Sequence, residues 1–141
     1  MIPTLERVLF LESVDLFGKF SGEELAPVAA IAVEEQREAG EDILREGDLG
    51  DSLYLLVEGK VRIHKGGQTL ALLGERESFG EMALLDPAPR SATATAETEV
   101  TLLKLAEADF RDLLEEKHEL ALGIIQVLTR RLRAADAGRL P

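Results

Sequence analysis

The sequence FGEMALLDPAPRSATA, residues 79–94, decides how the rest of this chain is interpreted. It begins with an aromatic residue, a glycine and a carboxylate, continues through a short apolar run and is then interrupted by Asp-Pro-Ala-Pro. It ends with an arginine, followed by a serine and a threonine among small residues. A glycine allows the backbone to approach a ligand closely, and the first amides of a helical turn attract an anion. This order of groups favours a site for a phosphorylated sugar.

Three polar side chains in this stretch have complementary chemistry. Arg90 carries a permanent planar cation that suits phosphate oxygens, and Ser91 can donate its hydroxyl to the same group. Glu81 can accept hydrogen bonds from sugar hydroxyls while it repels phosphate, so it would set the orientation of the ligand. The alternative is an ordinary turn in which Arg90 pairs with Asp86 or Glu81 at the surface. Spacing alone does not separate the two interpretations.

Composition and charge limit the class of protein. The chain has 141 residues, of which 45% are apolar, as expected for one globular domain over residues 1–141. It has no cysteine, which excludes disulfides, zinc–cysteine sites and thiol nucleophiles and fits the cytoplasmic location that we expect. The net charge of −11 opposes direct binding to nucleic acid.

Other short signals have simple interpretations. The cluster of Arg130, Arg131 and Arg133 favours a cationic helix C-terminus over a nucleic-acid patch. No apolar run approaches the roughly 20 residues that cross a bilayer, so no membrane association is expected. His64 and His118 are far apart in sequence, so we expect no metal site, and His64 is interpreted as a solvated strand residue.

The chain divides into three segments of different periodicity. Residues 1–32 are predicted to form an N-terminal helical bundle, with Thr4 capping its first helix and a Ser21-Gly-Glu-Glu24 capping box starting its second. Residues 33–105 carry glycines at short intervals between β-like runs and are predicted to form a β-roll. Residues 106–137 return to a helical period and are predicted to form two lid helices. Gly138 is predicted to end the second of them.

The predicted fold class is α+β. It is an eight-stranded antiparallel β-sandwich or jelly roll (a double-stranded β-helix), flanked by N-terminal helices and by two C-terminal helices. The last helix has a wider apolar stripe than one core contact requires. Burial within the domain is the favoured interpretation, and a partner helix, such as that of a second copy, or a ligand lid is the alternative use of the excess.

The quoted stretch also resembles a known family motif. Phe79-Gly-Glu-Met-Ala-Leu together with Pro89-Arg-Ser-Ala-Thr93 resembles the phosphate-binding cassette, residues 79–93, of cyclic nucleotide-binding domains. These domains occur in catabolite activator proteins and in the regulatory subunits of protein kinase A. A second motif resembles the family's glycine-rich signature: Gly40-x-x-Ile43-x-x-Glu46-Gly-Asp48-x-Gly50-Asp51-x-Leu53-Tyr54-x-Leu56-x-x-Gly59-x-Val61. Two long motifs in the same order make the resemblance specific.

The resemblance implies roles for matching positions. Glu81 would accept a hydrogen bond from the ribose 2′-hydroxyl, Arg90 would neutralise the cyclic phosphate, and Ser91 would hydrogen-bond to that phosphate. Gly80 would allow the backbone approach, and amides at Ala83 and nearby would complete the phosphate nest. The remaining cassette positions are Phe79, Met82, Ala92 and Thr93, and the predicted base pocket or lid residues are Val61, Leu73, Arg131 and Ala135.

Two positions depart from the family pattern. The family commonly has glycine where this chain has Arg76, so the loop before Phe79 must turn without it. The hydroxyls that contact adenine from the last helix of the catabolite activator are replaced by Ala135-Asp136. Serine after the cassette arginine is more typical of cAMP binders than of cGMP binders.

The resemblance implies a non-enzymatic, stand-alone sensor module that binds cAMP without any further cofactor. Because the sequence ends at Pro141 without a helix-turn-helix, we expect no direct DNA binding. The expected partners are an effector protein or a larger parent chain, and a second copy through the last helix. Two alternatives are a cGMP-preferring sensor and an interaction or scaffold domain that keeps the fold without responding to cyclic nucleotides.

Overall fold

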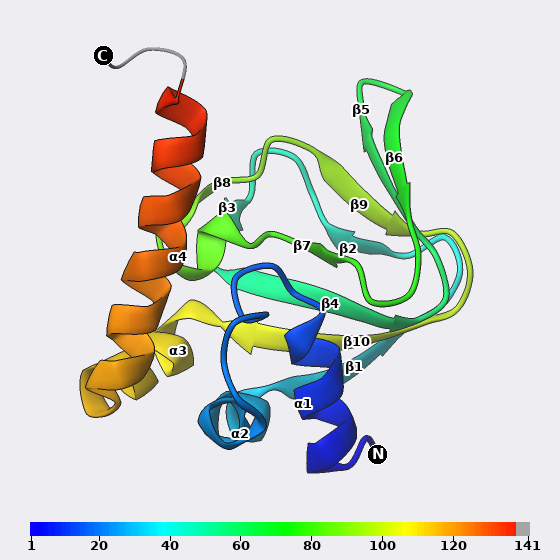
Figure 1. Ribbon diagram of the computed structural model, residues 1–141. Helices are drawn as coiled ribbons and strands as arrows, with labels where there is room; N and C mark the ends of the chain where they lie inside the picture. Colours follow the sequence, from blue (N-terminus) through cyan, green and yellow to red (C-terminus); the bar gives the residue numbers. More distant parts are fainter. Residues whose placement is uncertain (138–141) are drawn as a thin grey trace.

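Two four-stranded antiparallel sheets face each other in the computed structural model, which describes residues 1–137 (Figure 1). One sheet has the order β1-β10-β4-β7 and the other β2-β9-β5-β6, while a two-stranded ribbon, β3-β8, stands apart from both. The strands are β1 (Val33–Arg37), β2 (Asp42–Leu44), β3 (Leu49–Gly50), β4 (Ser52–Glu58), β5 (Val61–Lys65), β6 (Gln68–Leu73), β7 (Ser78–Phe79), β8 (Ala88–Pro89), β9 (Thr93–Ala96) and β10 (Val100–Ala106). The predicted eight-stranded sandwich is confirmed, and the β3-β8 ribbon is an addition that was not predicted.

Alternation along the strands builds a core between the two sheets. Leu56 and Leu102 of the first sheet pack with Val61 and Ala94 of the second, and all four are at most 1% exposed. The neighbouring residues Leu53, Leu55, Leu103 and Leu105 point to the opposite face of the first sheet. Because strand side chains alternate between faces, that sheet is apolar on both sides and needs a second covering layer.

The helices supply this covering layer. They are α1 (Thr4–Glu12), α2 (Gly22–Ile31), α3 (Glu107–Glu116) and α4 (His118–Asp136), with a 3₁₀ turn, η1 (Met82–Leu84), inside the cassette. Figure 1 shows them gathered on one side of the sandwich, with α4 rising past the β3-β8 ribbon. The link between α1 and α2, residues 13–20, is called the N-terminal segment below. Its Phe17 meets Phe110 of α3 edge to face, at 5.7 Å between ring centroids.

The helix starts test two cap predictions. The capping box of α2 is confirmed, because the Glu24 N–H donates to Ser21 Oγ at 3.2 Å and the Ser21 N–H donates to Glu24 Oε1 at 2.9 Å. The Thr4 cap is wrong: Thr4 is already helical, and Pro3 occupies the cap position without a side-chain hydrogen bond. Gly138 lies outside the described residues.

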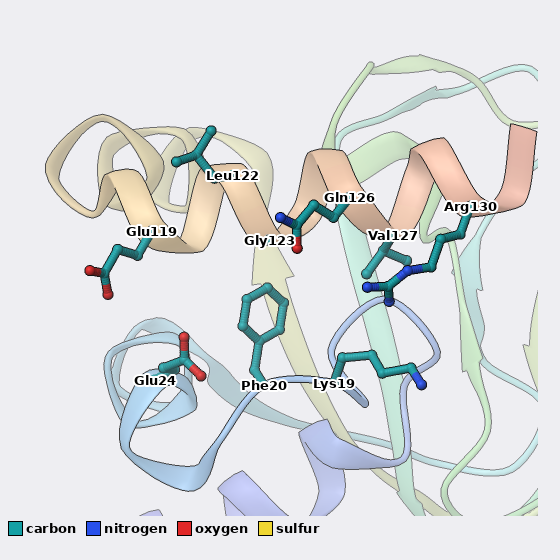
Figure 2. A pocket seen from close by; sticks show the side chains of 9 residues that line it. All are labelled: Lys19, Phe20, Glu24, Glu119, Leu122, Gly123, Gln126, Val127 and Arg130. Carbon is teal, nitrogen blue, oxygen red and sulfur yellow. The ribbon is translucent and has the colours of Figure 1, made fainter.

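α4 meets the N-terminal segment at a position where only glycine fits (Figure 2). The backbone of Gly123 lies against the ring of Phe20, and a Cβ atom there would stand 2.5 Å from Phe20 Cζ. This contact lets α4 pack close to residues 13–20. Among residues 1–137, no helix is both long and apolar enough to cross a membrane.

The loop without the family glycine adopts a left-handed backbone. Arg76 has a φ of 71°, a region that disfavours residues with a Cβ atom. The surrounding contacts hold it there: its N–H donates to the Leu56 carbonyl at 2.8 Å, and its own carbonyl accepts from Ser13 Oγ at 3.2 Å. Its guanidinium also lies 5.7 Å from the centroid of the Phe10 ring. The turn is therefore made without the glycine, at a cost in backbone strain.

Candidate ligand-binding site

The backbone of the cassette arginine is fixed by the first glycine-rich motif. β8 pairs with β3, which places Pro89 opposite Leu49. The N–H of Arg90 donates to the Asp48 carbonyl at 2.8 Å, and the Arg90 carbonyl accepts from the Gly47 N–H at 2.9 Å. The two sequence motifs are thus two sides of one ribbon, which gives a physical reason for their occurrence together.

The side chain of Arg90 lies between two glycines. Its Nη2 donates to the Ser52 carbonyl at 2.8 Å. A Cβ atom at Gly80, where φ is 80°, would lie 2.5 Å from Arg90 Nη1 and 2.7 Å from the Ser52 oxygen. A Cβ atom at Gly50 would overlap the same guanidinium. Both glycines are therefore required by close approach, and Gly80 also by its backbone conformation.

Arg90 is a half-buried cation without a neutralising partner. Among the residues that the structure describes, no carboxylate forms an ion pair with it, so the predicted alternative of pairing with Asp86 or Glu81 is not realised. Burial lowers the pKa of the Arg90 guanidinium, and the nearby Tyr54 and Asp51 oppose this shift in part. An arginine stays charged in proteins, so this site has an uncompensated positive charge that an anionic ligand would neutralise.

Two adjoining cavities open in front of this charge. The larger has a volume of about 570 Å³ and is lined by Gly80, Glu81, Met82, Ala83, Asp86, Ala88, Pro89, Arg90, Ser91 and Arg131. The smaller, of about 160 Å³, is lined by Leu44, Ile63, Phe79, Gly80, Arg90, Ser91 and Ala92. The shared wall contains Gly80, Arg90 and Ser91. The larger cavity is therefore bordered by several charged side chains and the smaller one mainly by apolar groups, with the Arg90 cation between them.

A second arginine reaches the larger cavity from α4. Arg131 Nη2 donates to Glu81 Oε1 at 2.7 Å and to Asp15 Oδ2 at 2.6 Å. The hydrogen bond to Glu81, followed by its charge, raises the pKa of Arg131. The Asp15 side chain is 83% exposed, whereas that of Glu81 is 21% exposed, so the pair with Glu81 is the better shielded of the two. Arg131 thus connects α4, the cassette and the N-terminal segment.

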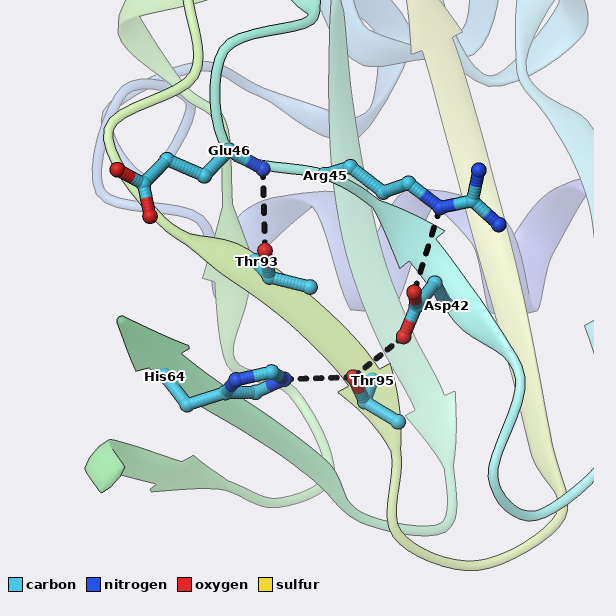
Figure 3. Close-up of polar contacts among 6 residues, drawn as sticks. All are labelled: Asp42, Arg45, Glu46, His64, Thr93 and Thr95. Carbon is cyan, nitrogen blue, oxygen red and sulfur yellow. Dashed lines mark hydrogen bonds and ion pairs between the residues drawn. The ribbon is translucent and has the colours of Figure 1, made fainter. Parts of the chain in front are cut away.

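The end of the cassette is tied to the sheet by a row of hydroxyl groups (Figure 3). Thr93 Oγ1 accepts from the Glu46 N–H at 3.0 Å. Two residues further along β9, on the same face, Thr95 Oγ1 donates to Asp42 Oδ1 at 2.7 Å. His64 Nε2 lies 2.7 Å from the same hydroxyl. His64 is therefore partly buried and hydrogen-bonded, in contrast to the solvated strand residue that was predicted.

Comparison with known families agrees with this arrangement. A family model described as the cyclic nucleotide-binding domain matches residues 34–117. This range contains both glycine-rich motifs and the whole cassette. The chain belongs to the cyclic nucleotide-binding domain family.

Relatives of this cyclic nucleotide-binding domain include bacterial regulators. It is 48% identical over 102 residues to the cyclic AMP receptor protein of Thermus thermophilus, a match that covers 69% of this chain and 47% of that protein. It is 32% identical over 127 residues to a CRP-like cAMP-activated global transcriptional regulator of Mycobacterium tuberculosis, covering 84% and 57%. The chain spans about half the length of these curated relatives.

The solved structures include a neighbour of nearly equal length. The crystal structure of the N-terminal domain of a transcriptional regulator from Streptomyces coelicolor A3(2) is similar, with a TM-score of 0.87 and 36% sequence identity. The match covers 94% of this chain and 96% of that one. The sandwich and its flanking helices are therefore also present in that solved domain.

The structure brings most of the predicted site residues of this cyclic nucleotide-binding domain together. The predicted residues that border one or both cavities are Phe79, Gly80, Glu81, Met82, Ala83, Arg90, Ser91, Ala92 and Arg131. Thr93 lies behind them, bonded to Glu46. The N–H of Ala83 donates to the Gly80 carbonyl at 3.2 Å, so in this conformation it is engaged in η1 and not directed to a ligand. The roles of these residues in ligand binding stay predictions.

Three predicted positions lie elsewhere. Val61 is 0% exposed in the core between the sheets, and Leu73 packs against the same core. Ala135 is exposed on α4 and does not border either cavity. Leu44 and Ile63 line the apolar cavity instead.

Other site residues were missed because their sequence signals are weak. The Ser52 carbonyl and Asp15 contact the two arginines through long-range hydrogen bonds. Ser52 occupies an unspecified position of the quoted glycine-rich motif, and Asp15 belongs to no motif, so neither was singled out. Gly50 was part of a quoted motif, but its contact with the Arg90 guanidinium was not predicted.

Proposed function

We propose that this domain binds cAMP, without catalysing a reaction, and that binding changes the position of α4. The observation that carries the proposal is the half-buried Arg90 cation, which has no carboxylate partner among residues 1–137 and faces a cavity shared with Glu81. Two relatives are named as a cyclic AMP receptor protein and a cAMP-activated regulator, which supports this ligand class. A cytoplasmic location is part of the same proposal.

The ligand would occupy both cavities. Its cyclic phosphate would lie between Arg90 and Ser91, and its ribose hydroxyl would donate to Glu81. The base would enter the smaller cavity, where Leu44, Ile63 and other apolar groups supply burial but few hydrogen bonds. Base selection would then depend on Ser91 and on groups outside this cavity, and the serine favours cAMP over cGMP.

Arg131 couples the site to α4. Glu81 already accepts a hydrogen bond from Arg131, so a ribose hydroxyl that binds Glu81 must share this carboxylate with α4 or displace the arginine. Either outcome gives the ligand a differential interaction with α4 positions, which is the physical requirement for a population shift. The sandwich would be the fixed part, and α3 and α4 the part that moves.

The exposed face of α4 supplies a surface for an output partner. Leu122, Ile125 and Leu132 are 59%, 58% and 63% exposed and, together with Thr129, follow the three-and-four spacing of a helical seam. We propose that a second copy pairs with this seam through its own α4. Signalling beyond the dimer would require an effector protein or a larger parent chain.

Titration calorimetry tests the ligand. Saturable heat with cAMP, and weaker binding of cGMP, are the expected results. Arg90→Ala should weaken cAMP binding by at least tens of fold, because removing a buried charged partner costs about 2–5 kcal/mol. Arg133→Ala is the matched control, since Arg133 is exposed on α4 and borders neither cavity.

Two outcomes would replace the proposal. Absence of saturable heat with either nucleotide at millimolar concentration would favour the scaffold alternative, which is motivated by the strained Arg76 and by the missing hydroxyls near Ala135. Tighter binding of cGMP would show that Ser91 does not select adenine.

A further inference from the structure

A second groove lies between α4 and the N-terminal segment, away from the cassette (Figure 2). It has a volume of about 530 Å³, and its floor is formed by Phe20 and Val127, which are both 8% exposed, around Gly123. Leu122, which is 59% exposed, lines it as well. Its dimensions and apolar floor suit a ligand or a partner side chain.

Charges of one sign meet at each end of this groove. At one end, Lys19 of the N-terminal segment and Arg130 of α4 line the same cavity from opposite walls. At the other end, Glu24 of α2 and Glu119 of α4 do the same. The neighbouring hollow adds one charge of each sign, Glu23 and Lys117, so it leaves the balance of this end unchanged. Each wall therefore repeats the charge of the wall it faces, and the two walls repel each other at both ends.

The cationic end has no internal explanation. Among residues 1–137, neither Lys19 nor Arg130 forms an ion pair, although the chain has 27 acidic and only 16 basic residues. The sequence cluster that contains Arg130 is divided by the fold. Arg131 turns to the cassette, while Arg130 turns to the groove. The helix-terminus interpretation of the cluster does not account for two cations that converge across a cavity.

We propose that this groove binds a helical segment of a partner protein that carries an acidic and a basic residue at its two ends. The acidic side chain lies between Lys19 and Arg130, and the basic one lies between Glu24 and Glu119. Glu119 and Arg130 are about 16 Å apart along α4 and lie on one side of it, so a partner helix presents its two charges about three turns apart. An apolar side chain between them covers Phe20.

The occupant converts two repulsions into four attractions. A carboxylate placed between two cations, and an ammonium between two carboxylates, relieves the unfavourable pairs that separate the walls. Because one wall is α4, the occupied groove holds α4 against the N-terminal segment. The groove is distinct from the cyclic nucleotide cavities, and its occupation does not require a nucleotide.

A synthetic helical peptide tests the proposal on the whole chain without nucleotide. The probe is an alanine- and leucine-based peptide with one glutamate and one lysine spaced as Glu119 and Arg130 are, and binding is measured by fluorescence anisotropy. A peptide with glutamine at both positions should bind about tenfold more weakly, because two pairs of exposed ionic contacts are lost. Equal binding of the two peptides, or no binding of either, would overturn the proposal.

Charge reversal in the protein supplies a readout that loss of structure cannot imitate. In the double variant Lys19→Glu, Arg130→Glu, the groove becomes acidic throughout, so the glutamate–lysine peptide should lose affinity while a lysine–lysine peptide gains it. Arg133→Glu changes charge on the same helix outside the groove and should alter neither peptide. Self-association of the wild-type chain that this double variant abolishes would assign the groove to a second copy and overturn the partner proposal. The cAMP titration of the wild type and of Arg90→Ala tests the nucleotide site separately, so the two proposals can fail independently.

Discussion

The two walls of the larger cavity beside Arg90 are held in different ways. On the cassette side, the backbone of Arg90 is bonded to Asp48 and to Gly47, and its side chain is fixed by the Ser52 carbonyl and by two glycines. On the side of α4, the described polar contact is the guanidinium of Arg131, shared between two carboxylates of which one is largely exposed. Backbone hydrogen bonds and close packing make the first wall stiff, whereas exposed ion pairs contribute little and allow the second to move.

Under the proposed function, this difference would let one cavity both fix the position of the ligand and transmit its binding to α4. A ligand bound to Arg90 would meet a wall that does not yield, so its position would be set by the β3-β8 ribbon. The same ligand meets at Glu81 a group whose partner belongs to α4. Under the proposed function, binding free energy would therefore reach the movable wall, where a small differential interaction can shift a population.

The largest effect on stability and on nucleotide binding should come from Gly80→Ala, which disrupts the packing of the stiff wall around Arg90. The new Cβ atom would lie 2.5 Å from Arg90 Nη1 and 2.7 Å from the Ser52 oxygen, at a φ of 80°. We expect the free energy of unfolding to fall by about 2–4 kcal/mol and nucleotide binding to be lost. Urea unfolding and calorimetry measure the two effects.

Gly66→Ala is the control for the backbone term alone. Gly66 has a φ of 58°, but a Cβ atom there would meet nothing within 4 Å. It should cost about 1 kcal/mol and leave ligand binding unchanged. Equal losses in the two variants would mean that the contact with Arg90 contributes nothing to the stiffness of this wall.

A smaller effect on the free energy of unfolding is expected from Gly123→Ala, which disturbs the contact between α4 and Phe20. Alanine improves helix propensity by about 1 kcal/mol, but overlap with the ring costs about 1–3 kcal/mol, so we expect a net loss of about 1 kcal/mol. The amides of α4 should exchange faster with solvent deuterium. Gly22→Ala, whose Cβ atom would meet Val8 at an ordinary 3.7 Å, should not destabilise the chain. A stabilised Gly123→Ala protein would contradict the close fit of α4.

Arg131→Ala should have a still smaller effect on stability. The arginine is 33% exposed, so we expect the loss to be about 0.5–1 kcal/mol, mostly through Glu81. Asp15→Asn should cost less, because that carboxylate is 83% exposed. Unfolding at low and at high salt checks the assignment, since screening reduces both losses. A loss from Asp15→Asn that equals the loss from Arg131→Ala would place the important contact at the N-terminal segment instead.

The elements that could be predicted carry local signals. The capping box of α2 is a four-residue pattern, and the paired glycine motifs mark the two sides of the ribbon. The alternation of Val61 and Ile63 with polar residues indicated one buried face of β5. Each of these patterns involves residues that are close together in sequence, and the corresponding local structure is present in the folded chain.

The errors concern position in space. Val61 and Ile63 share a face, and a period of two cannot tell which of them reaches the cavity; the pairing of β5 with β9 decides that Ile63 does. The contact of Ser52 with Arg90 spans 38 positions, and that of Asp15 with Arg131 spans 116. Arg76 makes its left-handed turn because Leu56 and Ser13 hold it, and neither is a sequence neighbour.

The smallest effect should lie on the outer face of the second sheet, far from both walls. The hydrogen bond from Thr95 lowers the pKa of Asp42 below its ordinary value; Arg45 and His64 act in the same direction, and burial opposes them. Because the folded-state pKa is the lower one, the stability that Asp42 contributes is complete above its unfolded pKa of about 4. This stability is lost as the pH falls through the folded value.

Asp42→Asn should therefore make the acid limb of the stability profile slightly shallower below about pH 4. The wild-type and variant curves should run parallel from pH 5 to pH 8, where the carboxylate stays ionised in both the folded and the unfolded chain. Nucleotide affinity should not change, because the hydroxyl row reaches the cassette only through Thr93, whose partner is Glu46. Thermal unfolding at a series of pH values, with the same series on Asp112→Asn, an exposed carboxylate of α3, as the control, measures the slope. If Asp42→Asn instead weakened nucleotide binding, the hydrogen bonds on the outer face of the second sheet would help to position the cassette for its ligand, in contrast to the purely structural role that we expect.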